Sequence, residues 1–259
     1  MMEQRHAFVT GGGTGIGKAI SMALCASGYV VSVAGRRLEP LETAVADISA
    51  AGEKGLAVAG FDVTDEASVE AGIARAMTHF GDIGVLVNCA GEAPSAPFEK
   101  TSLELWNKAL DVNLKGTFLT TQAALPSIRR AGRGRIVNIA STAGLAGYAY
   151  ITAYCAAKHG VIGLTRALAL ELAKTDITVN AVCPGFTRTP LIEGAIETII
   201  AKTGRTADEA LAGLARANPQ GRLVQPEEVA DAVMWLVGAG ASSVTGQAIA
   251  VAGGEVMTG

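Results

Sequence analysis

Short apolar runs alternate with helical patterns along almost the whole chain, and this alternation limits the possible folds most strongly. The runs are apolar on both faces, as strands of a parallel sheet buried between helices must be. A repeated strand–helix–strand order predicts a doubly wound α/β fold with right-handed crossovers. We expect strands around residues 8–9, 30–33, 56–58, 85–87, 136–139, 178–182 and 248–251, and helices near 16–27, 39–51, 66–80, 102–130, 153–174 and 226–238.

The chain has 259 residues, a length that fits one α/β domain. Hydrophobic residues make up 49% and charged residues 17%, which excludes a mainly disordered protein. Segment 188–218 breaks the alternation, because it is helical in composition and no strand follows it until residue 247. We therefore expect a single domain over 1–259 with a helical insertion at 188–218 that acts as a lid over the substrate.

The net charge of −3 argues against a nucleic-acid partner and gives no basic patch for a membrane. Two stretches, 136–157 and 232–254, lack charges and are long enough to cross a bilayer. Their glycines and polar side chains instead predict buried strands and loops, so we expect no membrane span. The first residues, Met1 to His6, contain an acid and lead directly into a strand. We therefore expect no signal peptide and a cytoplasmic location.

The cysteines and histidines show no metal-binding pattern, so we expect no metal site. No two cysteines form a CxxC pair, and buried packing is the favoured interpretation, with a redox-regulated thiol at Cys155 as the alternative. The residues concerned are Cys25, Cys89, Cys155, Cys183, His6, His79 and His159.

A glycine-rich segment follows the first predicted strand, from Thr10 to Lys18. Glycines at a strand-to-helix turn let the backbone approach a pyrophosphate, and the helix N-terminus supplies N–H groups. A P-loop would need Ser or Thr at position 19, which is Ala19, and the G-x-G-x-x-G pattern would need glycine at Ile16. The remaining pattern is Gly11, Gly15 and Gly17, which indicates a dinucleotide site; a plain tight turn is the alternative.

The second predicted strand ends in Arg36 and Arg37. An NAD-binding unit places an acidic residue there to accept a hydrogen bond from the ribose 2′-hydroxyl. Here the first acidic residue after the strand is Glu39. Guanidinium groups suit a 2′-phosphate, so NADP(H) is favoured over NAD(H). NAD(H) stays possible, because two solvated arginines at a strand end would also explain the pattern.

Tyr154 and Lys158 lie four residues apart, which places them on one face of a helix. A nearby ammonium favours a phenolate, so we expect Lys158 to lower the pKa of Tyr154 toward working pH. Tyr154 could then give a proton to a carbonyl or take one from an alcohol. Ser141 follows the strand around 136–139, at the sheet edge where ligands bind in open α/β folds.

Together these motifs resemble the short-chain dehydrogenase/reductase family over nearly the whole chain. The resemblance rests on Thr10 to Gly17, Asp62-Val63, Asn88-Cys89-Ala90-Gly91, Asn113, Ser141, Tyr154 to Lys158 and Pro184-Gly185, in that order. It implies a Rossmann-type sheet of seven parallel strands and NAD(P)-dependent oxidation of alcohols or reduction of carbonyls. It also implies a homodimer or homotetramer formed through segments 102–130 and 153–174.

The resemblance further implies residue roles. Tyr154 would be the general acid/base, Lys158 would lower its pKa and hold the nicotinamide ribose, and Ser141 would bind the substrate oxygen. Asn113 would hold a water in the proton relay, and Asp62 would meet the adenine amine. The cofactor site would comprise Gly11, Gly13, Thr14, Gly15, Ile16, Gly17, Arg36, Arg37, Asp62, Val63, Asn88, Ala90, Gly91, Tyr154, Lys158, Pro184, Gly185, Thr187 and Thr189.

The substrate should meet residues 144–150 and the 188–218 insertion, which are apolar with a few aromatics. This lining suits an acyl chain or a ring. The insertion and the tail resemble those of 3-oxoacyl-thioester reductases, polyketide ketoreductases and 3-hydroxyacyl dehydrogenases. A dehydrogenase of sugars or steroids is an alternative. So is a non-catalytic redox sensor, although the complete set of catalytic residue types argues against it. The chain is too short for the substrate domain of the family's epimerases and dehydratases.

Overall fold

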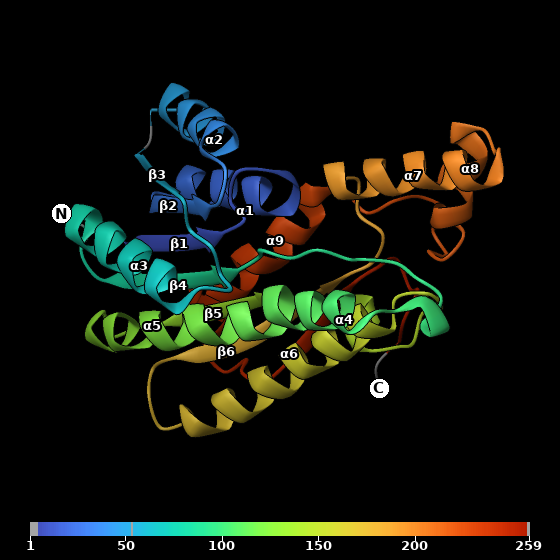
Figure 1. The fold of residues 1–259 in the computed structure, drawn as a ribbon. Coiled ribbons are helices and arrows are strands. Elements are labelled where there is room, and N and C mark those ends of the chain that lie inside the picture. Colours follow the sequence, from blue (N-terminus) through green and yellow to red (C-terminus); the bar gives the residue numbers. More distant parts are fainter. Residues whose placement is uncertain (1–4, 53, 258–259) are drawn as a thin grey trace.

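The computed structural model describes residues 5–52 and 54–257, and within them seven strands form one parallel sheet (Figure 1). The strand order is β3-β2-β1-β4-β5-β6-β7, which confirms the doubly wound fold. The expectation of a cytoplasmic location was based on residues 1–6. Of these, residues 1–4 lie outside the described residues. The strands are β1 (His6–Thr10), β2 (Val30–Gly35), β3 (Gly55–Ala59), β4 (Ile83–Asn88), β5 (Arg135–Ile139), β6 (Thr178–Pro184) and β7 (Ala248–Val251).

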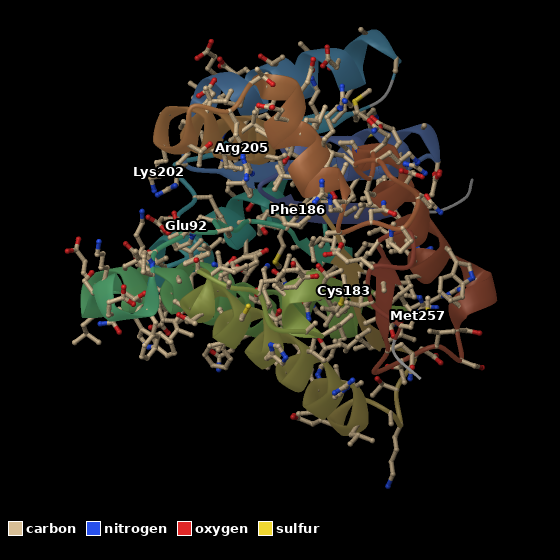
Figure 2. All side chains as sticks on the ribbon, turned by 90° about the vertical axis from the view of Figure 1, so that its right-hand side faces the viewer. Glu92, Cys183, Phe186, Lys202, Arg205 and Met257 are labelled. Atoms are coloured by element: carbon tan, nitrogen blue, oxygen red, sulfur yellow. The ribbon has the colours of Figure 1, made fainter. Side chains whose placement is uncertain are left out.

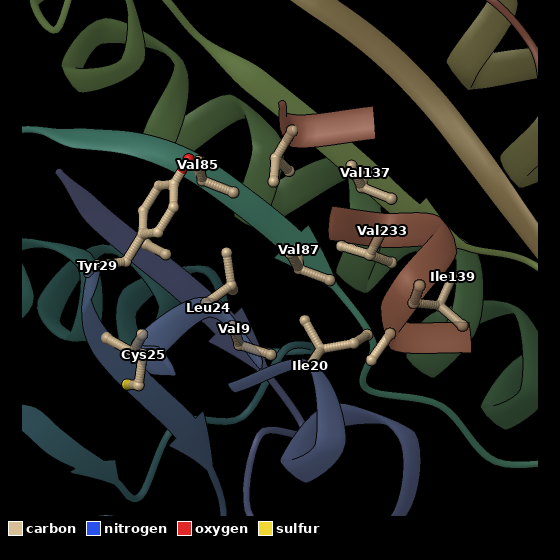
Figure 3. Close-up of a cluster of buried hydrophobic side chains, with 14 of the residues drawn as sticks. Val9, Ile20, Leu24, Cys25, Tyr29, Val85, Val87, Val137, Ile139 and Val233 are labelled. Carbon is tan, nitrogen blue, oxygen red and sulfur yellow. The ribbon is translucent and has the colours of Figure 1, made fainter. Parts of the chain in front are cut away.

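Helices cover both faces of the sheet (Figure 1). Helices α1 (Gly15–Ala26), α2 (Leu38–Ala50) and α9 (Pro226–Val237) pack on one face, and α3 (Glu66–Phe80), α5 (Gly116–Arg130) and α6 (Thr152–Glu171) pack on the other. Successive side chains of a strand point to opposite faces, so both must be apolar here. Figure 3 shows the first core, in which Ile20 lies beside Val9 of β1 and Val233 lies near Ile139 of β5. Phe8, which precedes Val9, belongs to the second core.

The helical segment expected over 102–130 is confirmed from Leu103 to Arg130, but it contains a turn that the sequence did not predict. Helix α4 (Leu103–Leu110) passes into a π-helical turn, Asp111–Lys115, before α5 begins. The side-chain amide of Asn113 donates to the Ala109 carbonyl, 2.9 Å away, which is the acceptor that the Asn113 backbone N–H would use in an α-helix. This competition explains the wider turn, and such π-turns are common at functional sites.

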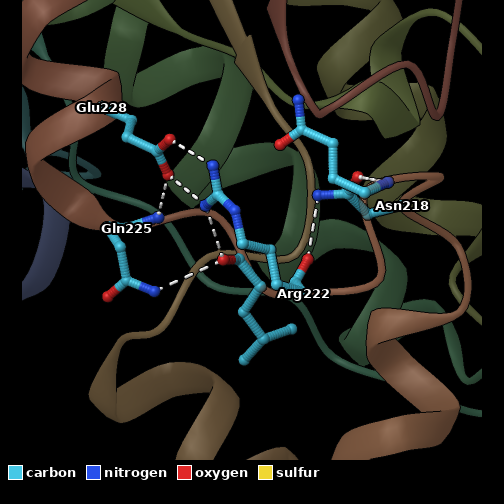
Figure 4. A network of polar contacts seen from close by, with 6 residues as sticks. Asn218, Arg222, Gln225 and Glu228 are labelled. Carbon is cyan, nitrogen blue, oxygen red and sulfur yellow. Dashed lines mark hydrogen bonds and ion pairs between the residues drawn. The ribbon is translucent and has the colours of Figure 1, made fainter.

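The 188–218 segment is helical, as its composition predicts. It forms α7 (Pro190–Thr203) and α8 (Ala207–Ala215) between β6 and α9. Thr187 and Val224 form a parallel bridge, so the chain leaves and returns beside the same point of the sheet edge. A polar network holds the return (Figure 4): the Arg222 guanidinium binds both oxygens of Glu228, at 2.7 and 2.6 Å, and Glu228 also accepts the Gln225 backbone N–H.

The outer face of α6 exposes less apolar surface for a subunit contact than the sequence suggests. Ala157, Ile162 and Leu172, which belong to the segment 153–174 expected at a subunit contact, are buried within this chain. Ala156 and Ala167 remain exposed on α6, and so does Leu170, which is 80% exposed. The surplus apolar surface is therefore smaller than the sequence suggests, but it is present. Within the described residues, none of the helices is both long and apolar enough to cross a membrane.

Candidate active site

The glycine-rich turn joins the end of β1 to the start of α1. Gly11 and Gly15 have φ angles of +65° and +51°, in the left-handed region that favours glycine. A Cβ on Gly17 would lie 2.2 Å from the carbonyl oxygen of Gly11, so no side chain fits there. The turn thus presents bare backbone at the N-terminus of α1, where N–H groups and the helix dipole favour an anion.

A cavity opens beside this turn at the C-terminal ends of β1, β2 and β4. Nine residues expected at a cofactor line it: Gly11, Gly13, Thr14, Arg36, Arg37, Asp62, Val63, Ala90 and Gly91. The Thr10 hydroxyl fixes one wall, because it accepts the backbone N–H groups of Cys89 and Ala90 at 2.9 and 3.0 Å. In an open α/β sheet this crevice beside the strand reversal is where a dinucleotide binds.

Asp62 and Arg36 set the charge of the cavity. The backbone N–H and hydroxyl of Thr64 donate to the Asp62 carboxylate at 2.9 and 2.8 Å. These hydrogen bonds, with the charges of Arg36 and Lys115, lower the pKa of Asp62, so the carboxylate is ionised at neutral pH. Arg36 and Arg37 are exposed at the rim, where their guanidinium groups can reach an anion.

The other expected cofactor residues divide into three groups. Thr189 packs on the turn: its Cγ2 would lie 3.1 Å from a Cβ on Gly15. Ile16 and Gly17 begin α1, while Pro184 ends β6 and leads into Gly185 and the buried Thr187. Asn88 lies apart from these, since its amide donates into the protein interior, to Thr121 and Asn138.

Ser141, Tyr154 and Lys158 come together where β5 ends and α6 begins. Ser141 caps a 3-10 turn, Thr142–Gly144, and a hydrogen bond joins its side chain to Tyr154. The Lys158 ammonium lies 5.5 Å from the centre of the Tyr154 ring and donates to the Ile139 carbonyl oxygen at 2.8 Å. The spacing expected from the sequence therefore produces the expected neighbours.

Asn113 faces Lys158 across Gly91. A Cβ on Gly91 would lie 2.8 Å from Asn113 Oδ1 and 3.7 Å from Lys158 Nζ. The Asn113 amide nitrogen donates to the carbonyls of Glu92 and Ala109, whereas its Oδ1 is buried and, among the described residues, accepts no hydrogen bond. A side chain at position 91 would collide with Asn113 Oδ1, so the bare glycine allows Asn113 and Lys158 to lie close together.

The expected fall in the pKa of Tyr154 is wrong for the chain on its own. Burial raises the pKa of Tyr154 to about 12, and the hydrogen bond with Ser141 offsets only part of that rise. Burial also lowers the pKa of Lys158 to about 8. A nearby ammonium favours the phenolate, but the cost of removing a phenolate from water is larger here. The phenol is therefore a protonated donor at neutral pH.

Three thiols surround this pair. Cys89, Cys155 and Cys183 all act electrostatically on Tyr154. Burial raises the pKa of Cys89 to about 12 and that of Cys183 to about 11, so both thiols are neutral and serve as small packing groups.

The model of the family described as short chain dehydrogenase matches residues 5–199. This chain belongs to that family. The dehydrogenase is 39% identical to cyclohexanol dehydrogenase of an Acinetobacter species, over 95% of this chain and 93% of that one. It is 37% identical to D-beta-hydroxybutyrate dehydrogenase of Cupriavidus necator, over 99% of each chain. A crystal structure of a variant of actinorhodin polyketide ketoreductase with NADPH matches with a TM-score of 0.94, 39% identity and 98% coverage of both chains.

Family membership makes this short-chain dehydrogenase an oxidoreductase that interconverts a carbonyl and an alcohol with a nicotinamide cofactor. The side where we expect the substrate faces the viewer in Figure 2, where Phe186 and Cys183 lie between Glu92 and Met257, below Lys202 and Arg205. Sequence reasoning missed Glu92 and Val112, which also line the cofactor cavity. Both lie close in sequence to predicted residues, Gly91 and Asn113, and that adjacency was the available signal.

Proposed function

We propose that the chain uses NADPH to reduce a ketone to a secondary alcohol, with Ser141, Tyr154, Lys158 and Asn113 as the catalytic residues. The observation that carries this proposal is the convergence of these four side chains at one edge of the sheet. The intact set also disfavours a non-catalytic sensor, which would need none of it.

The residues present fit NADPH. The bare backbone at Gly11, Gly15 and Gly17 leaves space for a pyrophosphate against the N-terminus of α1. Arg36 and Arg37 line the same cavity and would hold the 2′-phosphate. Asp62 would accept a hydrogen bond from the adenine amine. Lys158 would also bind the nicotinamide ribose, and Thr187 and Thr189 would face the carboxamide and phosphates. The bound cofactor supplies the hydride.

The side chains of the protein polarise the carbonyl and supply the proton. Ser141 and Tyr154 donate hydrogen bonds to the ketone oxygen and so polarise the carbonyl. Tyr154 then gives its phenolic proton to the oxygen as negative charge develops there, which typically contributes about 10²–10⁴-fold to the rate. The Lys158 ammonium stabilises the phenolate that remains. Asn113 Oδ1 holds a water near Lys158, through which the proton is replaced from solvent.

We infer that the substrate is a 3-oxoacyl thioester or a cyclic ketone, because residues 144–150 and the α7–α8 pair give a mostly apolar wall. The test follows NADPH oxidation with matched panels of 3-oxoacyl thioesters, cyclic ketones, sugars and steroid ketones. Turnover of one of the first two classes supports the proposal. NADPH binding without turnover of any ketone would favour the sensor, and turnover of sugars or steroids alone would reassign the substrate.

We also propose self-association into a homodimer or homotetramer. The outer faces of α5 and α6 carry Phe118 and Leu170, which are 43% and 80% exposed. Such side chains on adjacent helices suit an isologous two-fold contact.

A further inference from the structure

A carboxylate reaches the substrate side from the segment that follows β7. The Tyr148 hydroxyl donates to Glu255 Oε1 at 2.5 Å. Tyr148 belongs to the loop between Ser141 and Tyr154, and its ring meets Phe186 edge-to-face, with centroids 6.4 Å apart. Loops that follow β5, β6 and β7 therefore meet at this point.

The second oxygen of the carboxylate is directed toward the end of β6. Glu255 Oε2 would lie 2.5 Å from a Cβ on Gly185, so the bare glycine is what admits the carboxylate. Gly185 follows Pro184, and the register of β5 and β6 pairs Ile139 with Val182, so Ser141 and Pro184 both follow that pair by two residues at the same edge of the sheet. The Ser141 backbone N–H, moreover, reaches the Cys183 thiol. Glu255 is thus near the serine that binds the substrate oxygen in the proposed mechanism.

The charge on Glu255 is only partly compensated. Oε1 has the Tyr148 hydroxyl, but Oε2 is buried and, among the described residues, accepts no hydrogen bond. No ion pair to Glu255 occurs in that part of the chain either. Burial, followed by the bond to Glu255, raises the pKa of Tyr148 to about 12, so the tyrosine stays a neutral donor. A buried acceptor without a partner is costly, and a ligand that brings a donor removes that cost.

We propose that Glu255 determines substrate specificity: it accepts a hydrogen bond from a hydroxyl group of the ketone substrate and repels ketones that carry a carboxylate. The inference rests on the proposed ketone reduction and adds to it the class of substrate, a neutral hydroxyketone. Tyr148 is the positioning residue, because its hydroxyl and its packing on Phe186 orient the carboxylate.

The test compares three cyclohexanones that differ only opposite the carbonyl, where they carry a methyl, a hydroxyl or a carboxylate group. For the unmodified chain we expect kcat/KM to be highest for the hydroxyl compound and at least about tenfold lower for the carboxylate than for the methyl compound. In Glu255→Gln, which keeps the side-chain shape, the penalty on the carboxylate compound relative to the methyl compound should largely disappear. Glu227→Gln, which removes an equal charge from the exposed start of α9, should keep the original ratios.

Each ratio is measured within one variant, so a general loss of activity does not affect it. Identical ratios in the unmodified chain and Glu255→Gln would overturn the inference and leave Glu255 as a latch for the tail. If Glu255→Gln does not bind NADPH, Glu255→Asp replaces it; retracting the carboxylate should weaken the hydroxyl preference but keep the carboxylate penalty, and unchanged ratios would again overturn the inference. Failure of all three ketones with the unmodified chain would also overturn the inference, whereas the proposed reduction itself fails only if the 3-oxoacyl thioesters are not reduced either.

Discussion

The Lys158 ammonium lies 2.8 Å from the Ile139 carbonyl oxygen and 5.5 Å from the centre of the Tyr154 ring. The end of β5 therefore fixes this charge beneath the phenol before any ligand arrives. A hydrogen bond to a rigid strand end costs little reorganisation during a reaction, which is how preorganised charges aid catalysis. The position of Lys158 thus links the sheet to the proton chemistry that we propose for Tyr154.

The rate of ketone reduction should fall as the pH rises through about 8. Burial lowers the pKa of Lys158 to about 8, so the side chain is an ammonium below that pH and a neutral amine above it. Only the ammonium stabilises the phenolate left on Tyr154. The measurement is kcat/KM for NADPH-dependent reduction against pH. Lys158→Arg should move the fall to higher pH, because arginine stays charged; a rate that rises through pH 8 would contradict this role.

Arg36→Asp should weaken the use of NADPH by at least about tenfold and improve that of NADH, because a carboxylate repels a 2′-phosphate and accepts from a 2′-hydroxyl. The check is kcat/KM with each cofactor. Arg133→Asp makes the same charge change at an exposed site before β5 and should leave the preference unaltered. A preference for NADH in the unmodified chain would show that the interpretation of Arg36 is wrong.

The insertion at 188–218 should close over the bound ligands. Most of α7 and α8 is exposed, and Gly194 and Gly213, which lie inside these helices, lower the stability of the segment. Hydrogen exchange of peptides from 188–218 should be fast in the free protein and slow with both cofactor and substrate. Peptides from α9 provide the internal control. Equal protection with and without ligands would make the segment a fixed scaffold.

Light scattering at micromolar concentration should show a dimer or tetramer of the 26.3 kDa chain. Leu170→Asp should dissociate it, because this side chain is exposed on α6. Leu38→Asp, at an exposed site on α2, should not. A single species of monomer mass for the unmodified chain would refute the assembly.

The sequence predicts the fold well because its signals are local. The strand β7 is an unbroken apolar run and β4 is apolar up to Asn88, while Gly11, Gly15 and Gly17 mark a turn that requires glycine. The π-helical turn at Asn113 was missed because it depends on the hydrogen bond from the Asn113 side chain to the Ala109 carbonyl, which hydrophobic periodicity does not indicate.

The site was predicted less completely than the fold. The raised pKa of Tyr154 was missed because burial is set by surrounding elements rather than by the distance to Lys158 along the helix. Glu255 was missed because nothing in a single tail residue indicates that it reaches Tyr148, 107 positions earlier in the chain.

The most direct measurement is the single-turnover reduction of a ketone by Tyr154→Phe, together with its NADPH affinity. The substitution removes only the hydroxyl, so the ring still packs and the cofactor should bind as before. We expect the reduction rate to fall by at least about 10²-fold, whereas Tyr29→Phe, remote from the site, should react normally. A Tyr154→Phe variant that keeps more than about a tenth of the unmodified rate would contradict the assignment of Tyr154 as the proton donor.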